Sequence, residues 1–178
     1  GQSFRDFLAG KLPALPGQRP TLKDWEDHLT TAFPEVRLKR YLEMRGADGG
    51  PWGRLCALPA LWAGLLYHQP SLDAAWDIAR DWSMEERIQL REEVPRLGLR
   101  TEIRGRTVGD SARELIELAR LGLAARDRLN AAGDNETGFL SPLQEVAETG
   151  VTPAERKLAL FQGAWNGSVD PVFTECAY

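Results

Sequence analysis

The clearest pattern in this chain is an alternation of apolar and polar side chains between residues 33 and 52. The apolar positions are even-numbered, and they are Val36, Leu38, Leu42 and Met44; only Arg40 breaks the alternation. The polar positions are odd-numbered, and they are Glu35, Arg37, Lys39, Tyr41, Glu43 and Arg45. Because side chains alternate between the two faces of a strand, this pattern predicts a strand over residues 36–45 with one packed face and one charged face. A glycine-rich turn at residues 46–51 ends the predicted strand.

The predicted strand has no strong partner elsewhere in the chain, although the backbone N–H and C=O groups of a strand must pair with something. Residues 97–103 and 169–173 are only weak candidates for a second strand. We therefore expect the strand to belong to a sheet whose other strands lie in a preceding N-terminal portion. The first residues, Gly1-Gln2-Ser3, lack an initiating Met, which agrees with a fragment of a longer protein.

The rest of the chain has the periodicity of amphipathic helices. Residues 55–67 are apolar on nearly every side, which predicts a central helix. Several helix starts have a hydroxyl residue that can act as a cap, most of them with an acidic residue three positions later. These starts are Thr21 with Asp24, Ser71, Ser83 with Glu86, Thr107 with Asp110, and Thr152 with Glu155. The predicted class is α+β and predominantly helical, with one clear strand followed by several amphipathic helices.

Composition narrows the classes of partner. The 178 residues are 43% hydrophobic and 27% charged, which is typical of one globular domain. The net charge of −4 leaves no basic excess to neutralise a phosphodiester backbone, so we do not expect a nucleic-acid partner. The longest apolar run, residues 55–67, is shorter than the ~20 residues that span a bilayer, so we do not expect a membrane partner. Cys56 and Cys176 form no CxxC motif and follow no signal peptide, which predicts a reducing, cytoplasmic location.

Glu43 and Arg45 are the residues of the predicted strand whose side chains most clearly suit a catalytic or binding role. Because they are two positions apart, a carboxylate that could hold a metal ion and a guanidinium that could hold a phosphate point the same way. On residue types alone, a solvated strand face with a neighbouring ion pair is the commoner explanation. The turn at residues 46–50 lacks the GxxxxGK[ST] pattern of a P-loop, so a structural turn is favoured there.

Other candidate groups favour structural interpretations. His28 and His68 have no Cys or second His nearby, so metal binding by either is not expected. Cys56 lies in an apolar helix, where a neutral and unreactive thiol is expected. Most of the six tryptophans fall on apolar stripes, whereas Trp52 lies in the turn beside the charged strand and is a candidate for ligand contact.

The charged strand and its turn also carry a family resemblance. Residues 28–31, 33–52 and 55–60 closely resemble the plant and proteobacterial type of glutamate–cysteine ligase. Residues 4–13, 152–156 and 168–173 extend the likeness over essentially the whole chain. The resemblance corresponds to the C-terminal part of that enzyme, with residues 21–52 forming a helix, active-site strand and turn, and residues 53–178 forming a helical part.

The resemblance implies a fold related to glutamine synthetase and an active site on a curved antiparallel sheet. The implied reaction joins the γ-carboxylate of L-glutamate to the amine of L-cysteine through γ-glutamyl phosphate, with ATP as co-substrate and Mg²⁺ as cofactor. More distant relatives carry a Glu-x-Arg motif on the equivalent strand, which assigns Mg²⁺ to Glu43 and the ATP phosphates to the catalytic Arg45. Tyr41, Arg37 and Trp52 are weaker candidates for substrate binding.

The resemblance also implies that other metal and substrate ligands belong to the N-terminal portion of the enzyme. We therefore expect the 178-residue chain alone to be inactive. Plant members are redox-regulated through a disulfide, but Ala14 stands where a cysteine would be expected, so such a switch is not expected here. Two other functions stay open: a noncatalytic helical module that binds a protein, and a related carboxylate–amine ligase that uses another amine.

Overall fold

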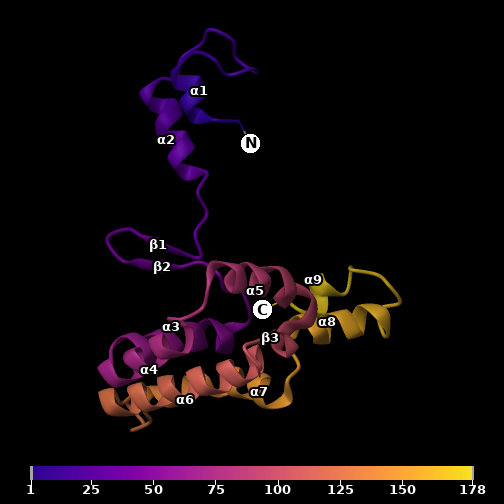
Figure 1. Cartoon of the computed structure of the whole chain (residues 1–178). Coiled ribbons are helices and arrows are strands. Elements are labelled where there is room, and N and C mark those ends of the chain that lie inside the picture. The colour runs from indigo at the N-terminus through magenta and orange to yellow at the C-terminus, as the bar shows by residue number, and fades with distance from the viewer. Residues whose placement is uncertain (1, 178) are drawn as a thin grey trace. The chain divides into compact units, whose positions relative to one another are not determined.

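The computed structural model describes residues 2–177 and divides the chain into two compact units, Gly1–Asp48 and Gly49–Tyr178. Figure 1 shows the elements of each unit in chain order. The first unit contains two helices and a β-hairpin, and the second is almost entirely helical. The predominantly helical α+β class expected from the sequence is confirmed.

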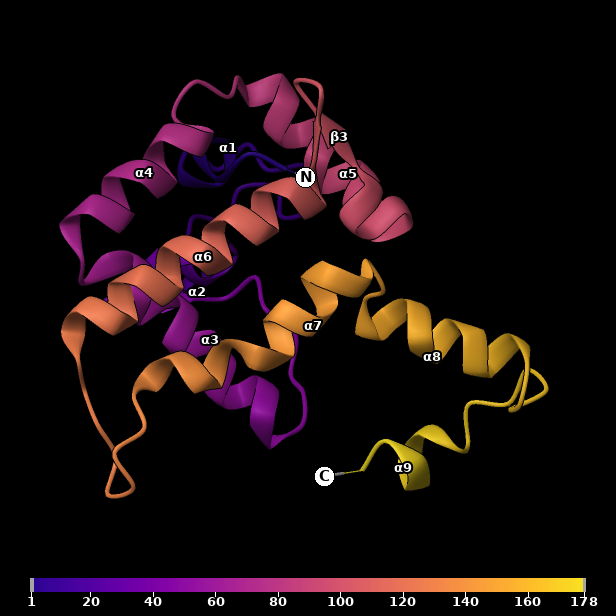
Figure 2. The same ribbon diagram turned by 90° about the horizontal axis from the view of Figure 1, so that it is seen from below.

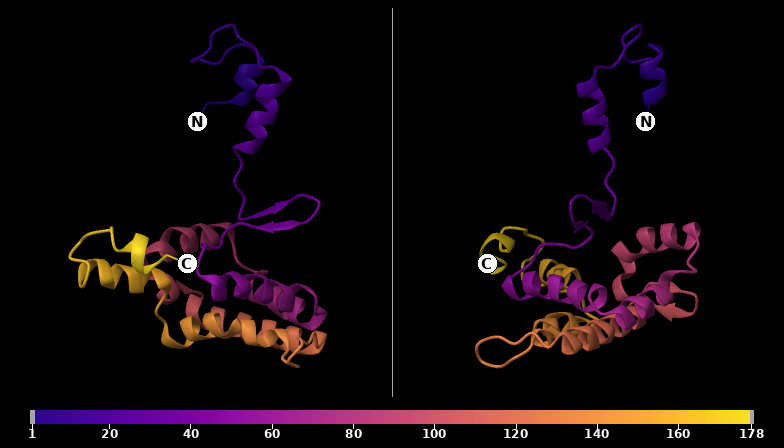
Figure 3. Two further views of the ribbon diagram at one scale, coloured as in Figure 1. Left: turned by 180° about the vertical axis from the view of Figure 1, so that it is seen from behind. Right: turned by 90° about the vertical axis from the view of Figure 1, so that its left-hand side faces the viewer.

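The first unit begins with α1 (Phe4–Leu8) and α2 (Leu22–Thr30). The capping box predicted at the start of α2 is present, because the Thr21 hydroxyl accepts a hydrogen bond from the Asp24 N–H and Asp24 accepts one from the Thr21 N–H. The Phe4 ring stacks on His28 at a centroid distance of 4.4 Å and lies 5.2 Å from Trp25. These aromatic contacts hold α1 beside α2, as Figure 3 shows.

The segment expected as one continuous strand is instead a hairpin of β1 (Val36–Leu38) and β2 (Leu42–Met44). The pairing is antiparallel, with Val36 opposite Met44 and Leu38 opposite Leu42. Residues 39–41 make the turn, and they include the one position that interrupts the alternation, residue 40. The single-strand prediction was wrong because each half of the segment supplies the backbone partners that the other half needs.

The second unit has a small apolar core. Its helices are α3 (Trp52–Leu66), α4 (Gln69–Ala79), α5 (Met84–Leu97), α6 (Val108–Arg126), α7 (Ser141–Thr149), α8 (Pro153–Gln162) and α9 (Val172–Glu175). Short 3₁₀ turns η1 (Gly98–Arg100) and η2 (Glu136–Leu140) and a small hairpin of β3 (Glu102–Ile103) and β4 (Arg106–Thr107) connect them. The core residues come from α3, α6 and the end of η2, and they are Ala60, Leu65, Ala119, Leu123 and Leu140. Among residues 2–177, no helix combines the length and apolarity needed to cross a membrane.

Helices α3 and α6 approach each other closely, and Figure 2 shows α6 lying across α3. The contact depends on two glycines. A Cβ atom on Gly64 would overlap the carbonyl oxygen of Ala119, and a Cβ atom on Gly122 would overlap the carbonyl oxygen of Gly64. Absence of a side chain at both positions therefore sets how near the two backbones can lie.

Most predicted helix starts are correct, because the capping boxes of α5, α6 and α8 are all formed. The prediction for Ser71 was wrong, since α4 begins two residues earlier, at Gln69. Ser71 is buried, and its hydroxyl donates to the carbonyl oxygen of Leu118 on α6 at 2.7 Å. The Ser71 hydroxyl oxygen also lies 2.8 Å from His68 Nδ1. Because the hydroxyl proton is given to Leu118, the imidazole donates to this oxygen and is held in a structural role. The weak strand candidates also differ, because residues 102–103 pair with a neighbouring strand and residues 172–175 are helical.

Candidate active-site hairpin

The polar face of the first hairpin gathers the charged residues singled out in the sequence. Arg37 lies directly opposite Glu43 in the register. The pairing continues one step beyond the strands, where the Arg45 N–H donates to the carbonyl oxygen of Glu35 at 2.8 Å. An antiparallel pair keeps the side chains of opposite residues on the same face. The charged face predicted from alternation therefore survives the fold into a hairpin.

Arg37 and Glu43 form an ion pair across the hairpin. Arg37 Nε donates to Glu43 Oε2 at 2.7 Å, and the two side chains are 36% and 30% exposed. This hydrogen bond is the main reason that the pKa of Glu43 lies below its ordinary value, and the nearby charges of Lys39 and Arg45 add to it. Glu43 is therefore ionised at neutral pH. Its other oxygen, Oε1, accepts no hydrogen bond from residues 2–177.

Arg45 extends from the end of β2 on the same face. Its guanidinium carbon lies 5.4 Å from the centroid of the Phe33 ring, a cation–π arrangement. Its Nη1 atom is buried and has no hydrogen-bond partner among residues 2–177. A buried guanidinium nitrogen without an acceptor is unfavourable, and a bound anion would satisfy it.

The other predicted site residues, Tyr41 and Trp52, lie outside the strands of this hairpin. Tyr41 lies in the turn of the hairpin, not on a strand, and is 61% exposed. Trp52 belongs to the second unit, where it is the first residue of α3 and is 77% exposed. Sequence reasoning missed Phe33 as the residue that supports Arg45. The signal was the interrupted alternation at residue 40, since a turn there brings the segment before β1 back to the end of β2.

The donor set of this face fits one ligand of a hard metal ion. Carboxylate oxygen suits Mg²⁺, and Glu43 has an ionised carboxylate with one oxygen free. Within the part of the chain that the structure describes, no cluster of three or more His, Cys, Asp or Glu residues could hold a metal ion. Glu43 could thus contribute one ligand to a metal centre, but residues 2–177 do not supply the others.

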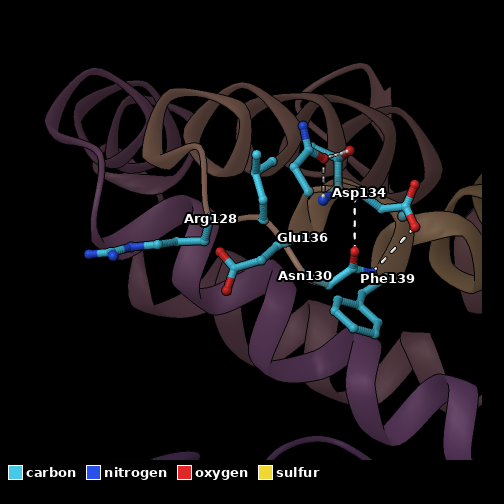
Figure 4. Close-up of a pocket in the computed structure, with 9 residues that line it drawn as sticks. Arg128, Asn130, Asp134, Glu136 and Phe139 are labelled. Atoms are coloured by element: carbon cyan, nitrogen blue, oxygen red, sulfur yellow. Dashed lines mark hydrogen bonds between the residues drawn. The ribbon is translucent and has the colours of Figure 1, made fainter. Parts of the chain in front are cut away.

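A separate hollow of about 720 Å³ lies in the loop after α6 (Figure 4). The side-chain oxygen of Asn130 accepts hydrogen bonds from the N–H groups of Ala132 and Asp134. Glu136, which also lines the hollow, pairs with Arg126 at 3.3 Å. In Figure 4 the Arg128 side chain extends away from Asp134. Since its main polar groups already stabilise the loop, this hollow is a consequence of the loop fold.

Comparison with known proteins extends these observations. The family model described as glutamate-cysteine ligase family 2 (GCS2) matches residues 5–175. The whole chain is 57% identical to a chloroplastic glutamate–cysteine ligase of Solanum lycopersicum, 58% to one of Medicago truncatula and 56% to one of Arabidopsis thaliana. It covers 33%, 34% and 33% of these relatives, so it spans about a third of their length.

The names of these relatives contradict the cytoplasmic location expected from the sequence, because all three are chloroplastic. That expectation was wrong because cysteine usage reports a reducing environment and does not distinguish one reducing compartment from another. The resemblance seen in the strand and turn, in contrast, is confirmed by matches that run the length of the chain. The chain belongs to glutamate-cysteine ligase family 2.

Proposed function

We propose that this chain supplies about a third of an ATP-dependent ligase that joins the γ-carboxylate of L-glutamate to the amine of L-cysteine, the first step of glutathione synthesis. The observation that carries the proposal is the polar face of the first hairpin. There an ionised carboxylate with one free oxygen, Glu43, lies between two guanidinium groups, Arg37 opposite and Arg45 two positions along the strand. Family membership supports the same reaction.

In this proposal Glu43 holds Mg²⁺ through its free oxygen. The ion, when bound, would neutralise charge on the phosphates of ATP. The hydrogen bond from Arg37 keeps Glu43 ionised, so the carboxylate needs no deprotonation before it accepts a cation.

Arg45 binds the phosphoryl group that passes from ATP to glutamate. Its guanidinium can donate two parallel hydrogen bonds to phosphate oxygens, and its buried Nη1 has no other acceptor among residues 2–177. The Phe33 ring supports the planar group from one face. Fixed donors of this kind stabilise charge that shifts during phosphoryl transfer without having to reorganise. Tyr41 and Trp52 are weaker candidates for substrate contact.

We also propose that the chain alone is inactive and that the rest of the ligase covers the apolar face of the hairpin. Support comes from the lack of a three-ligand metal cluster in residues 2–177. The exposure of the apolar face supports the proposed cover: Val36, Leu38 and Leu42 are 46%, 80% and 53% exposed. An apolar strand face that stays in water gains none of the free energy that burial would provide.

Two substitutions in the complete ligase test the assignment. Glu43→Gln and Arg45→Ala should each lower kcat by about 10²-fold or more, because each removes a group that stabilises the transition state. Glu92→Gln and Arg91→Ala, at exposed positions of α5, are the matched controls and should leave kcat unchanged. Initial rates of γ-glutamylcysteine formation under saturating substrates give the comparison. Near-normal turnover by both hairpin variants would exclude the proposed roles.

A further inference from the structure

The ion pair between Arg37 and Glu43 differs in geometry from a comparable pair in the second unit. Arg104 binds both carboxylate oxygens of Glu86, with Nε donating to Oε1 at 2.7 Å and Nη2 donating to Oε2 at 2.9 Å. Arg37 instead donates through Nε to one oxygen, Glu43 Oε2. One pair therefore uses the whole carboxylate, whereas the other leaves an oxygen free.

The backbone also fixes the Arg37–Glu43 pair. The two residues are directly opposite in an antiparallel register, so their Cβ atoms are neighbours whatever rotamers the side chains adopt. The short contact from Nε sets the orientation of the carboxylate and decides which oxygen is unoccupied. Lys39 and Arg45 also bear positive charge near Glu43 but donate no hydrogen bond to it.

We propose that Arg37 is a positioning residue that binds Glu43 Oε2 and so directs Glu43 Oε1 toward the metal ion. This inference rests on the proposed function, in which Glu43 is a metal ligand. It changes the role expected for Arg37 from binding a substrate to orienting a ligand. Hydrogen-bond partners of metal ligands typically contribute 10–100-fold to metal affinity.

If Arg37 acted only as a counter-ion of Glu43, it would lower the affinity for the metal ion instead of raising it. If Arg37 only neutralised Glu43, it would compete with the metal, and removing its positive charge would strengthen metal binding. A positioning residue strengthens metal binding despite its charge. The direction of the change in metal affinity therefore separates the two roles.

The experiment uses the complete ligase with ATP, without cysteine, and Mn²⁺ as the probe for the magnesium site. Electron paramagnetic resonance gives the Kd for Mn²⁺ without turnover. The variants are Arg37→Lys, which keeps the charge but loses the fixed planar donor, and Arg37→Met, which loses both. Lys39→Gln is the matched control, because it removes a nearby charge and keeps the hydrogen bond.

We expect about a tenfold weaker Kd for Mn²⁺ in both Arg37 variants and less than a twofold change in the Lys39 variant. An unchanged Kd in Arg37→Lys, or a tighter one in Arg37→Met, would overturn the inference. Should Arg37→Met fail to fold, Arg37→Lys decides by itself. Glu43→Gln separates the two levels of the proposal: if it binds Mn²⁺ normally, the metal role of Glu43 fails, whereas loss of Mn²⁺ with unchanged Arg37 variants refutes only the positioning role.

Discussion

The two units of this chain differ in whether they bury apolar residues in a core. In the helical unit, Ala119 and Leu123 are fully buried and Leu140 is 1% exposed. In the hairpin, Leu38 is 80% exposed although it lies on the face that alternation marks as apolar. The helical unit thus contains its own core. The hairpin has a polar face that could take part in chemistry and an apolar face that the described residues of its unit leave exposed.

The helical unit therefore accounts for most of the stability of the chain, and the hairpin carries the proposed function. The close contact of α3 and α6 depends on residues with no chemical function, and the candidate site depends on a hairpin that contributes little to a core. Changes in the helical unit should therefore act mainly on stability. Changes in the hairpin should act mainly on the complete enzyme.

The close contact of α3 and α6 should make Gly122→Ala strongly destabilising. Alanine is favoured over glycine in a helix by about 1 kcal/mol, but its Cβ would overlap the Gly64 carbonyl oxygen and force α3 and α6 apart. We expect a net loss of about 3 kcal/mol in the free energy of unfolding, measured by urea denaturation followed by circular dichroism. Gly138→Ala has open space around it and should change the stability by less than about 0.5 kcal/mol. Equal stability of the two variants would contradict the close helix contact.

A smaller effect on stability is expected when an exposed apolar residue of the hairpin is replaced. In the 178-residue chain, Leu38→Asp should alter the free energy of unfolding by no more than about 0.5 kcal/mol, because Leu38 is exposed. By comparison, Leu123→Ala at a fully buried position of the helical unit should cost about 2–5 kcal/mol. In the complete ligase, Leu38→Asp should lower the melting temperature, because the proposed cover would then bury a charge. An unchanged melting temperature there would show that the apolar face stays exposed.

The smallest expected effect is a loss of stability of the helical unit at low pH. The pKa of Asp110 is lowered to about 2, chiefly by the side-chain hydrogen bond from Thr107, and that of Glu155 to about 2, chiefly by the backbone hydrogen bond from Thr152. Both folded-state values lie below the unfolded values of about 4. The ionised carboxylates therefore stabilise the folded helical unit above about pH 4, and this stabilisation is lost as the pH falls toward 2.

Urea midpoints measured between pH 7 and pH 2.5 test this acid dependence. Asp110→Asn should flatten the decline below pH 4, because the asparagine at this position does not titrate. Glu43→Gln in the same chain is the control from the hairpin and should leave the acid dependence of the helical unit unchanged. A decline with the same slope in Asp110→Asn as in the unmodified chain would show that this cap does not contribute.

The sequence predicted most of the helical unit because helix signals are local. Capping boxes such as Thr107 with Asp110 involve residues three positions apart, and the apolar helix was evident from residues 55–67 alone. Ser71 was mistaken for a cap because its actual acceptor, Leu118 O, is 47 residues away. Local patterns contain no information about such a partner.

The candidate site was predictable in part. Alternation placed Glu43 and Arg45 on one face and Arg37 with them, and that grouping does not depend on whether the segment is one strand or two. The opposition of Arg37 to Glu43 and the cation–π contact of Arg45 with Phe33 could not be seen without the turn at residues 39–41. The chemical roles came from family resemblance, because an exposed charged pair on a strand is usually only a solvated face.

The central claim is that Glu43 and Arg45 act in phosphoryl transfer from ATP to glutamate, and that step can be measured alone. Rapid-quench detection of glutamate-dependent ADP formation, with the complete ligase and no cysteine, reports the first turnover. The account predicts that Glu43→Gln and Arg45→Ala lose this first-turnover ADP by about 10²-fold or more, while Glu92→Gln retains it. First-turnover ADP at the unmodified rate in both hairpin variants would contradict the account.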